Sequence, residues 1–467
     1  MFLDTYIHVH TEYSNLRIKD STVKINELLQ LCKKQGVKSC SITDHEALTG
    51  HVEFLNEVNK MKKDGYEIKP ILGNEVYVTE DDSHVKNEGH FTGREYNHLI
   101  LLAKNLNGYK QLCQLSSQAW ENGFFSSRYF RVPVDYSDLK KYIKKGDIII
   151  SSACLGGFVG HRLLTMYYAK QEGNIETVKE QARLLDKWIL KYKDLVAEGD
   201  LYFEIQPNEP NTDQWIANKL IVKFAEKYNI PVIVTCDIHY LRPENREAHE
   251  VFLRSKDDDN REVASFYKYT YFFTSDELEK FISENLGAEK YKEIIKNTNA
   301  VKDKIEIYSL DLPTQMPNIN VPTKIEFKEV FKGYYDSHPA FKFFRYSDDV
   351  YNQLLFRNIE NGFIERILNH PDKSKEKEKY IEELHTNLDV LQFMQTEHNK
   401  NFSSYFLVVK ELNDLIIDKA DSFMGLSRGS ACSFLVNYLL GIVEIDPVKW
   451  GLPYWRFMNK SRIDSPD

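Results

Sequence analysis

The sequence predicts an α/β fold in the first part of the chain and a mostly helical region after it. Up to about Leu241, short runs of β-branched and apolar residues alternate with segments whose apolar residues recur every three or four positions. Beyond this point strand signals become rare and highly charged helical segments follow. The alternation is typical of strand–helix units that form a mostly parallel sheet, and strands that are apolar on both faces suit the core of a barrel.

The first region alternates predicted strands with predicted helices. Short apolar runs bounded by turn residues predict strands over residues 6–10, 39–43, 70–78, 98–104, 148–152, 201–206 and 232–236. Apolar residues at helical spacing predict helices over residues 25–35, 52–63, 108–120, 178–192 and 213–228. Gly36 is expected to close the first of these helices.

The second region contains mainly predicted helices, over residues 244–254, 275–283 and 288–305. A loop follows them, and it contains Pro313, Pro317 and Pro322. The charge run from Lys373 to Lys379 is typical of a solvated linker or helix face. From Phe406 the chain is apolar again, and a helix is expected over residues 431–440. We expect one domain over residues 1–270 and a second over residues 271–467.

Composition and charge exclude several classes of protein. Of the 467 residues, 42% are hydrophobic and 28% are charged, which is too apolar for a disordered chain. No apolar run reaches the ~18 residues that a bilayer span needs, and Asp4 stands where a secretion signal needs positive charge. The net charge of −9 gives no overall positive field for nucleic acid. From the missing span and signal we expect a soluble, cytoplasmic protein, and the six cysteines, which show no C-x-x-C spacing, are expected to be reduced thiols.

Residue types that bind metals recur where the predicted strands begin or end. His8 and His10 are two residues apart on the first strand, so both side chains would leave the same face. Acids, histidines and one cysteine stand at later strand ends: Asp44, His45, Glu75, His98, Cys154, Asp237 and His239. Each of these has an ordinary structural explanation, such as a capping aspartate or a core cysteine. Their recurrence favours one shared site at the rim of a barrel.

This mixture of donors suits clustered divalent metals. Imidazoles bind borderline transition metals, a carboxylate such as Glu75 can bridge two ions, and a thiolate from Cys154 favours zinc over magnesium. Clustered metals hold a bridging hydroxide and stabilise both oxygens of an in-line displacement at phosphorus. The pattern therefore indicates hydrolysis of a phosphate ester.

Five segments together resemble the polymerase and histidinol phosphatase (PHP) domain that begins bacterial replicative polymerases of family C, the DNA polymerase III alpha subunits. These segments are His8–Ser14, Ile42–His45, Gly73–Tyr77, His98–Asn105 and Asp237–Leu241. The resemblance implies a distorted seven-stranded βα barrel that holds up to three metal ions, zinc or manganese. It assigns one site to His8, His10, Glu75 and Asp237, a second to Glu75, His98 and Cys154, and a third to Asp20, His45 and His239.

The sequence departs from this family near Asp20. Family members usually carry this aspartate sooner after the serine, as Leu-Asp-Gly, whereas Asn15 to Lys19 intervene here. Because no ligand position is lost, the resemblance favours an active 3′–5′ exonuclease of the proofreading kind.

A second resemblance covers the C-terminal part. A glycine–serine loop with a cation, followed by a helix N-terminus, can cradle phosphate, although a structural turn with a serine cap is the ordinary explanation. The segments around it are similar to the start of the family C palm: Ser404–Val409, Leu440–Pro447, Arg456–Asn459 and Pro466–Asp467. The resemblance implies that Arg428, Gly429 and Ser430 bind the triphosphate of an incoming nucleotide. One departure is Leu426-Ser427, where many members have Pro-Gly.

In the family, the palm aspartates that bind Mg²⁺ follow the Pro-Asp pair with which this sequence ends. We expect either a truncated chain or a split polymerase. We also expect a palm with an open sheet edge that would pair with a strand of another chain. The expected partners are DNA primer–template, dNTPs, a complementary C-terminal polypeptide and other replisome subunits, with no membrane. Two alternatives stay open: a stand-alone phosphoesterase of a small phosphomonoester, and a non-catalytic, metal-stabilised scaffold subunit.

Overall fold

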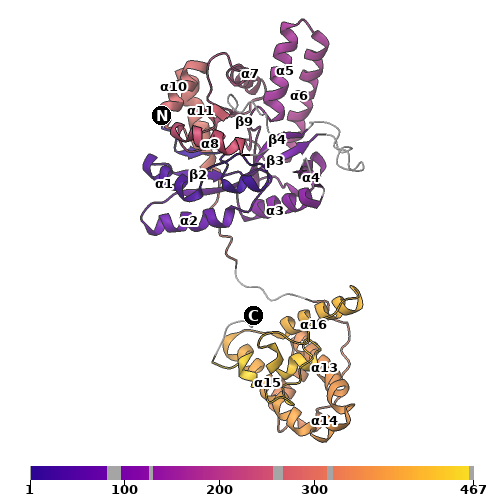
Figure 1. Cartoon of the computed structure of the whole chain (residues 1–467). Coiled ribbons are helices and arrows are strands. Elements are labelled where there is room, and N and C mark those ends of the chain that lie inside the picture. Colours follow the sequence, from indigo (N-terminus) through magenta and orange to yellow (C-terminus); the bar gives the residue numbers. More distant parts are fainter. Residues whose placement is uncertain are drawn as a thin grey trace. The chain divides into compact units, whose positions relative to one another are not determined.

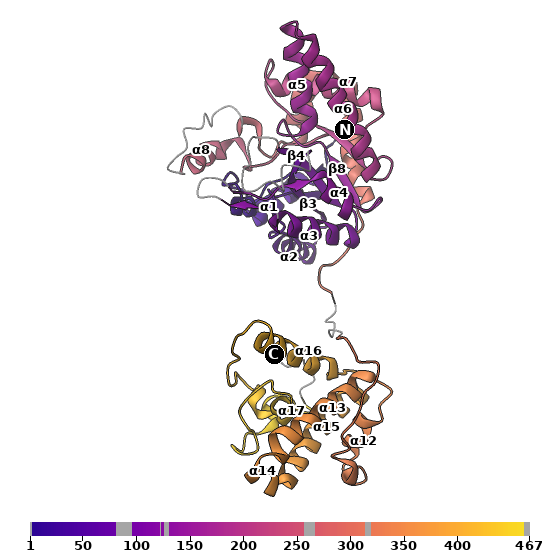
Figure 2. The ribbon, with the colours of Figure 1, turned by 90° about the vertical axis from the view of Figure 1, so that its right-hand side faces the viewer.

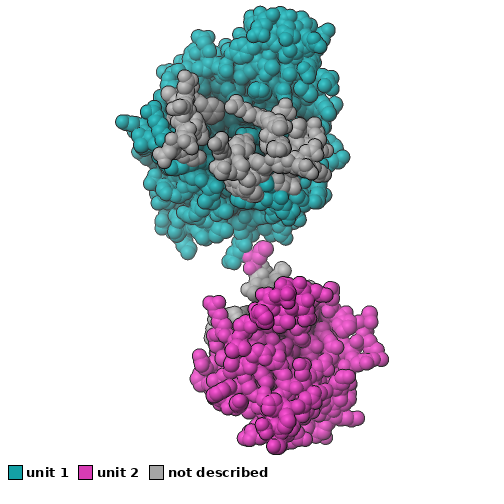
Figure 3. Space-filling view, turned by 45° about the vertical axis from the view of Figure 1, so that its right-hand side comes forward, with its two compact units in different colours: residues 1–311 teal, residues 312–467 magenta. Residues whose placement is uncertain are grey.

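The computed structural model describes residues 2–80, 96–121, 123–125, 130–255, 267–312 and 319–461. It divides into two compact units, Met1–Asp311 (unit 1) and Leu312–Asp467 (unit 2), which Figure 3 colours separately. The sequence predicts a division after residue 270. The structure instead places residues 271–311 in unit 1. They lie there because apolar side chains of this segment, such as Phe272, Ile282 and Tyr291, are fully buried in the same core as the strands.

Unit 1 is built on a curled sheet, so the predicted α/β barrel is confirmed (Figure 1). Its main strands follow the order β1 (Thr5–Tyr6), β2 (Ser39–Ile42), β3 (Lys69–Thr79), β4 (Tyr96–Ala103), β8 (Ile148–Ser151), β9 (Leu201–Ile205) and β10 (Val232–Val234). A short strand β7 (Val134–Asp135) pairs with β3. An isolated parallel bridge between Val9 and Ile238 joins the two ends of this order. The sheet therefore curls around interior side chains such as Ile71 and Ile100, and this bridge links the segments that follow β1 and β10.

One strand departs from the expected parallel arrangement. β4 runs antiparallel to both of its neighbours, β3 and β8. In the register of β3 and β4, Tyr77 lies opposite His98 and Glu75 lies opposite Ile100. The antiparallel direction therefore brings His98, at the start of β4, close to Glu75.

Helices alternate with the strands along much of unit 1, and several of them pack against strands. They are α1 (Ile25–Gln35), α2 (His51–Lys63), α3 (Leu106–Glu121), α4 (Tyr136–Tyr142), α5 (Phe158–Gln171), α6 (Ile175–Leu195), α7 (Asp213–Tyr228), α8 (Arg246–Arg254), α10 (Ser275–Leu286) and α11 (Ala288–Ala300). The helices over residues 25–35 and 213–228 have the predicted bounds, and the first ends at Gly36, whose φ of 68° is left-handed. α5 is not predicted by the sequence, and it packs beside α6 (Figures 1 and 2).

The strands β5 (Phe124–Phe125) and β6 (Phe130–Arg131) pair antiparallel in a separate two-stranded sheet. Among the described helices of the chain, none combines the length and the apolar character required to cross a bilayer.

The secondary structure of unit 2, in its described residues, consists of helices joined by loops. Its helices are α12 (Pro339–Arg345), α13 (Val350–Phe363), α14 (Pro371–Lys375), α15 (Lys377–His398), α16 (Ser403–Asp418) and α17 (Leu435–Leu439). The charge run from Lys373 to Lys379 lies on α14 and the start of α15, mostly exposed, as predicted. Pro313, Pro317 and the Pro466–Asp467 pair lie outside the described residues.

Two predictions for unit 2 are wrong. The segment Tyr405–Val409 lies within α16, and none of the described residues of unit 2 forms a strand, so this part of the chain presents no open sheet edge. The helix expected over residues 431–440 is interrupted, because Phe434 is extended (φ −115°, ψ 114°) between a 3₁₀ turn, Ala431–Ser433, and the short α17. The apolar side chains of this segment, Phe434 among them, pack into the core of unit 2 instead.

Candidate metal centre

The nine residues assigned by resemblance come together at one end of the curled sheet. Seven of them line a cavity of about 190 Å³, together with Ile18 and three tyrosines, Tyr77, Tyr96 and Tyr267. His8 and His10 lie directly behind these residues and are fully buried. Asp44, also at a strand end, lies outside the cavity lining. Its carboxylate accepts hydrogen bonds from the Thr11 backbone N–H (2.6 Å) and the Ser14 hydroxyl (2.8 Å).

The donor atoms fall into three groups, within each of which they lie no more than 4.8 Å apart. The groups are His8, His10, Glu75 and Asp237; Glu75, His98 and Cys154; and His10, His45 and His239. Asp20 adjoins the third group, since its Oδ2 lies 3.0 Å from His45 Nε2 and 3.5 Å from His239 Nε2. Glu75 belongs to two groups, which is the position of a bridging carboxylate.

The sequence predicts that His8 and His10 meet because they lie two residues apart on one strand, and this reason is wrong. The strand predicted over residues 6–10 ends at Tyr6, because His8 has a left-handed backbone with φ of 63°. The two side chains converge all the same, with 3.1 Å between their Nε2 atoms. The barrel-closing contact places them, since the backbone N–H of His10 donates to the carbonyl of Ile238 at 2.9 Å.

Mutual attraction controls the charge state of the buried groups. Burial alone would raise the pKa of Glu75, but His98 and His45 hold it well below its usual value. Burial opposes ionisation of Asp237 in the same way, and His8 and His239 keep the pKa of this carboxyl well below its usual value. Burial raises the pKa of the Cys154 thiol, and the carboxylates of Asp237 and Glu75 raise it further. Cys154 therefore has to lose a proton before it can bind a cation.

Three carboxylate oxygens in this pocket are buried and lack a well-formed hydrogen bond. They are Asp20 Oδ1, Glu75 Oε1 and Asp237 Oδ1, although His98 Nδ1 lies close to Glu75 Oε1 and His8 Nε2 lies 3.0 Å from Asp237 Oδ1. A buried ionised oxygen without well-formed hydrogen bonds is costly, and such atoms are explained by a cation. Together with imidazole and thiol donors, these oxygens are positioned so that they could hold metal ions.

Comparison with known proteins finds relatives for both units of the chain. The model of the PHP domain matches residues 7–208, and the model of the bacterial DNA polymerase III alpha NTPase domain matches residues 353–467. Over 468 residues, 98% of this chain and 36% of the relative, the sequence is 34% identical to the probable DNA polymerase YorL of Bacillus subtilis (strain 168). Over 477 residues, 99% of this chain and 35% of the relative, it is 31% identical to the DNA polymerase III subunit alpha of Aquifex aeolicus (strain VF5).

The chain belongs to the bacterial DNA polymerase III alpha family. It spans about a third of the length of the curated relatives that it matches. The two matched regions fall in different units of the structure, the PHP domain in unit 1 and the polymerase region in unit 2.

Strained backbone surrounds the donor atoms of this polymerase III alpha relative. Of the nine described non-glycine residues with left-handed φ values, four lie here: His8 (63°), Glu46 (48°), Ala153 (59°) and Asp237 (47°). Each of these residues is a candidate ligand or directly adjoins one, namely His45 or Cys154. Non-glycine residues in this region cost energy and gather at functional sites. The sequence alone gives no indication of this strain.

Several side chains that form hydrogen bonds with the imidazoles are not among the site residues that the sequence predicts. Glu204 accepts a hydrogen bond from His8 Nδ1 at 2.6 Å, Ser14 Oγ lies 3.1 Å from His10 Nδ1, and the Tyr77 hydroxyl lies 3.0 Å from His45 Nδ1. Glu204 leaves a trace in the sequence, because it is a carboxylate inside the apolar strand Leu201–Ile205. The pairing of the other two side chains with histidines depends on the fold.

The residues expected to bind nucleotide lie on an exposed segment of unit 2. Arg428 and Gly429 are exposed, and Gly429 is left-handed with φ of 64°. The Ser430 carbonyl accepts hydrogen bonds from the backbone N–H and the hydroxyl of Ser433, at 3.0 and 2.8 Å. A three-residue 3₁₀ turn follows, in place of the predicted helix N-terminus.

Proposed function

We propose that unit 1 carries a metal-dependent phosphodiesterase that removes nucleotides from DNA 3′ ends, within a polymerase of the DNA polymerase III alpha type. The observation that carries this proposal is the sharing of Glu75 between two donor groups, which also contain carboxylate oxygens without well-formed hydrogen bonds. A shared carboxylate fits neighbouring cations, and neighbouring cations suit displacement at phosphorus.

Zinc or manganese fits the donors better than magnesium does. His8, His10, Glu75 and Asp237 would hold one ion, and Glu75, His98 and Cys154 a second. Asp20, His45 and His239 would hold a third. When bound, such a cluster supplies a metal-activated water as nucleophile and stabilises charge on the leaving oxygen.

The chain's own residues prepare this site. Asp20, Glu75 and Asp237 remain ionised, because facing histidines lower the pKa of each carboxyl against the effect of burial. The Tyr267 hydroxyl donates to Asp20 Oδ2 at 3.2 Å, and His249 Nε2 lies 2.6 Å from the Asp20 carbonyl oxygen. These contacts fix Asp20 at the edge of the cavity, where the sequence departs most from the family pattern.

We also propose that unit 2 contributes to a nucleotide site that uses DNA primer–template, dNTPs and Mg²⁺. The support is the match of residues 353–467 to the polymerase family, whose relatives are named DNA polymerases. Arg428, Gly429 and Ser430 would contact the triphosphate. The palm aspartates would come from sequence that corresponds to the remaining length of these relatives, on this or on another polypeptide.

The test uses purified chain, stripped of metal with a chelator and incubated with 3′-labelled single-stranded or mismatched primer DNA. We expect release of label only after addition of Zn²⁺ or Mn²⁺, and at least about a 100-fold loss in Asp237→Ala. Asp348→Ala, an exposed aspartate of unit 2, serves as the matched control.

The alternatives predict other results. Turnover of a small phosphomonoester without activity on DNA would indicate a stand-alone phosphoesterase. Bound metal with no hydrolysis of either substrate would indicate a scaffold.

A further inference from the structure

Glu204 is a buried carboxylate directly behind the candidate metal centre. It lies on β9, is 1% exposed, and is absent from the three donor groups. Its Oε1 accepts a hydrogen bond from His8 Nδ1 at 2.6 Å. We propose that Glu204 is a positioning residue that fixes the orientation and tautomer of His8 and thereby sets the metal affinity of the site that contains His8.

The geometry determines which nitrogen of His8 is left for a metal. With Nδ1–H donating to Glu204, the free electron pair is on Nε2. This atom lies 3.0 Å from Asp237 Oδ1 and 3.3 Å from Glu75 Oε2, in the first donor group. A histidine ligand whose second nitrogen donates to a carboxylate is held in one orientation and is more basic, hence a stronger ligand.

Glu204 is itself held in place by side chains at the ends of β8, β9 and β10 or directly after them. Thr235 donates its hydroxyl to Oε1 at 2.5 Å, and the Gln206 amide donates to the same oxygen at 3.1 Å. Ser151, at the end of β8, donates to Oε2 at 2.8 Å. With donors on both oxygens the carboxylate cannot rotate away, so its position defines the position of the His8 ring.

The other imidazoles of the cluster are held by weaker acceptors. His10 faces the Ser14 hydroxyl, His45 faces the Tyr77 hydroxyl, and His239 Nδ1 donates to the Asp237 carbonyl at 2.8 Å. Among the described residues that bond to these imidazoles, Glu204 is the charged one that is not itself a proposed metal ligand. Its removal should therefore weaken the site that contains His8 and spare the other two.

This inference rests on the proposed metal centre, and the test separates the two. Metal-free full chain is titrated with Co²⁺, whose visible absorption reports coordination, and affinities are measured by competition with a chelator. For Glu204→Gln we expect a 10- to 100-fold weaker affinity at one site with an altered spectrum for that site, while the remaining sites keep the wild-type affinity. Glu360→Gln is the matched control, since Glu360 is a fully buried glutamate of unit 2 that accepts backbone N–H bonds from Lys328 and Val330.

Each outcome is decisive. Equal Co²⁺ affinities and spectra for wild type and Glu204→Gln would overturn the inference, whereas no Co²⁺ binding by wild type would overturn the proposed metal centre. Uniform weakening of every site would also overturn the inference, because it would indicate a general structural role. If Glu204→Gln does not fold, the double variant Ser151→Ala/Thr235→Val loosens the same carboxylate. A several-fold loss confined to one site is then expected, and no change would contradict the inference.

Discussion

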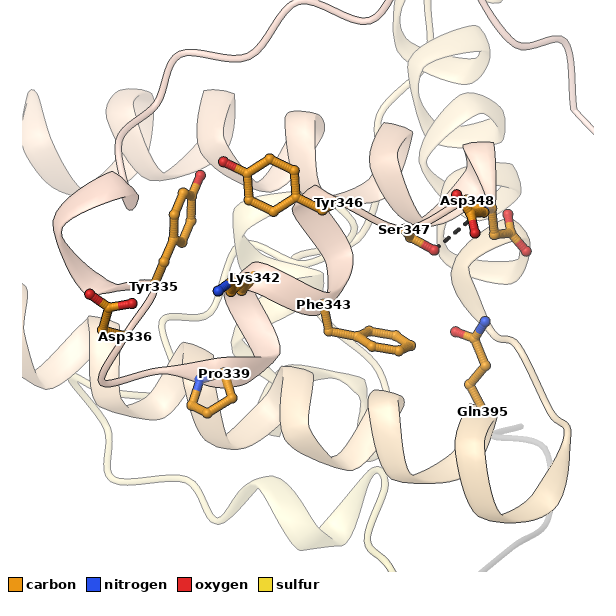
Figure 4. A pocket seen from close by; sticks show the side chains of 10 residues that line it. Tyr335, Asp336, Pro339, Lys342, Phe343, Tyr346, Ser347, Asp348 and Gln395 are labelled. Carbon is orange, nitrogen blue, oxygen red and sulfur yellow. Dashed lines mark hydrogen bonds between the residues drawn. The ribbon is translucent and has the colours of Figure 1, made fainter.

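A small hollow in unit 1 and a larger one in unit 2 differ in the side chains that line them. The candidate metal pocket of unit 1 measures about 190 Å³ and is lined largely by buried titratable groups. The hollow of unit 2 measures about 800 Å³ and is lined by α12 and the residues around it. Figure 4 shows that its labelled side chains, such as Tyr335, Lys342 and Gln395, are spread out and do not converge on one centre.

The polar groups of the two hollows have different partners. In unit 2, Asp349 accepts a hydrogen bond from the Tyr351 backbone N–H and Gln395 accepts one from Asn352, so these groups support the fold. In unit 1, Asp20, Glu75 and Asp237 converge with histidines, and each has a buried oxygen without a well-formed hydrogen bond. Convergent buried charge is therefore a better indication of a candidate site than the volume of a hollow.

The largest effect should come from Glu75→Gln, which tests whether the converging donors of unit 1 are needed for metal binding and DNA hydrolysis. Glu75 Oε2 lies 2.9 Å from His10 Nε2 and 3.2 Å from His45 Nδ1, and Oε1 pairs with His98. We expect metal content, measured by mass spectrometry, to fall by at least one ion per chain. DNA hydrolysis should fall at least about 100-fold. Asp348→Asn, in the larger hollow, should change neither quantity, and a Glu75→Gln chain with full metal content would break the comparison.

The next largest effect concerns a buried histidine outside the cluster. His51 Nε2–H donates to the Gly73 carbonyl at 2.9 Å, and burial lowers the pKa of His51 to about 4. The unfolded chain has a histidine pKa of about 6.5, so it binds the proton first. Stability that His51 contributes above pH ~6.5 is therefore lost as the pH falls toward 4, by up to about 1.4 kcal/mol per pH unit.

His8 should behave in the opposite way in metal-free protein. Burial lowers its pKa, but Asp237 and Glu204 raise it well above the usual value. Its contribution is thus present below pH ~6.5 and is lost as the pH rises through the folded pKa.

The prediction for His51 is checked by urea unfolding of metal-free wild type and His51→Gln at pH 7 and pH 5. The variant should lose less stability at pH 5, and equal losses would show that His51 titrates normally in the fold.

A smaller effect is expected from Asp349→Ala in the larger hollow. Asp349 caps α13 through its 2.8 Å bond from the Tyr351 N–H and accepts a second bond from Asn401. Loss of such a cap should lower the free energy of unfolding of unit 2 by about 1 kcal/mol. Asp336→Ala, an exposed neighbour in the same hollow, should stay within about 0.5 kcal/mol of wild type in thermal unfolding. Equal stabilities of the two variants would show that Asp349 does not support the fold.

The smallest effect is expected from Arg428→Ala, because this cation is exposed rather than convergent. Nucleotide binding by the chain should be millimolar or weaker, about −4 kcal/mol. The variant should weaken it by no more than about five-fold, the effect of one exposed ion pair. Calorimetry with a dNTP and Mg²⁺ measures both quantities. Tight binding that Arg428→Ala leaves unchanged would contradict the proposed nucleotide site.

The sequence by itself determined which residue types reach the strand ends. Local apolar patterns place Glu75 on β3, His98 at the start of β4 and Cys154 just after β8. Local patterns also set the bounds of α1 and α7, because capping and helical periodicity act over a few residues. The same reasoning failed in unit 2 around Phe434, where packing into the core outweighs the helical tendency of the neighbouring residues.

Only the tertiary structure decided how these residues meet. The bridge between Val9 and Ile238 closes the barrel, the left-handed φ of His8 turns its ring toward Asp237, and Glu204 reaches His8 from 196 positions away in the chain. Sequence patterns record which segments form strands, but not which strands pair or in what register, because those contacts join residues distant in the chain. The chemistry of the donors is therefore local information, and their arrangement into a site is a property of the closed sheet.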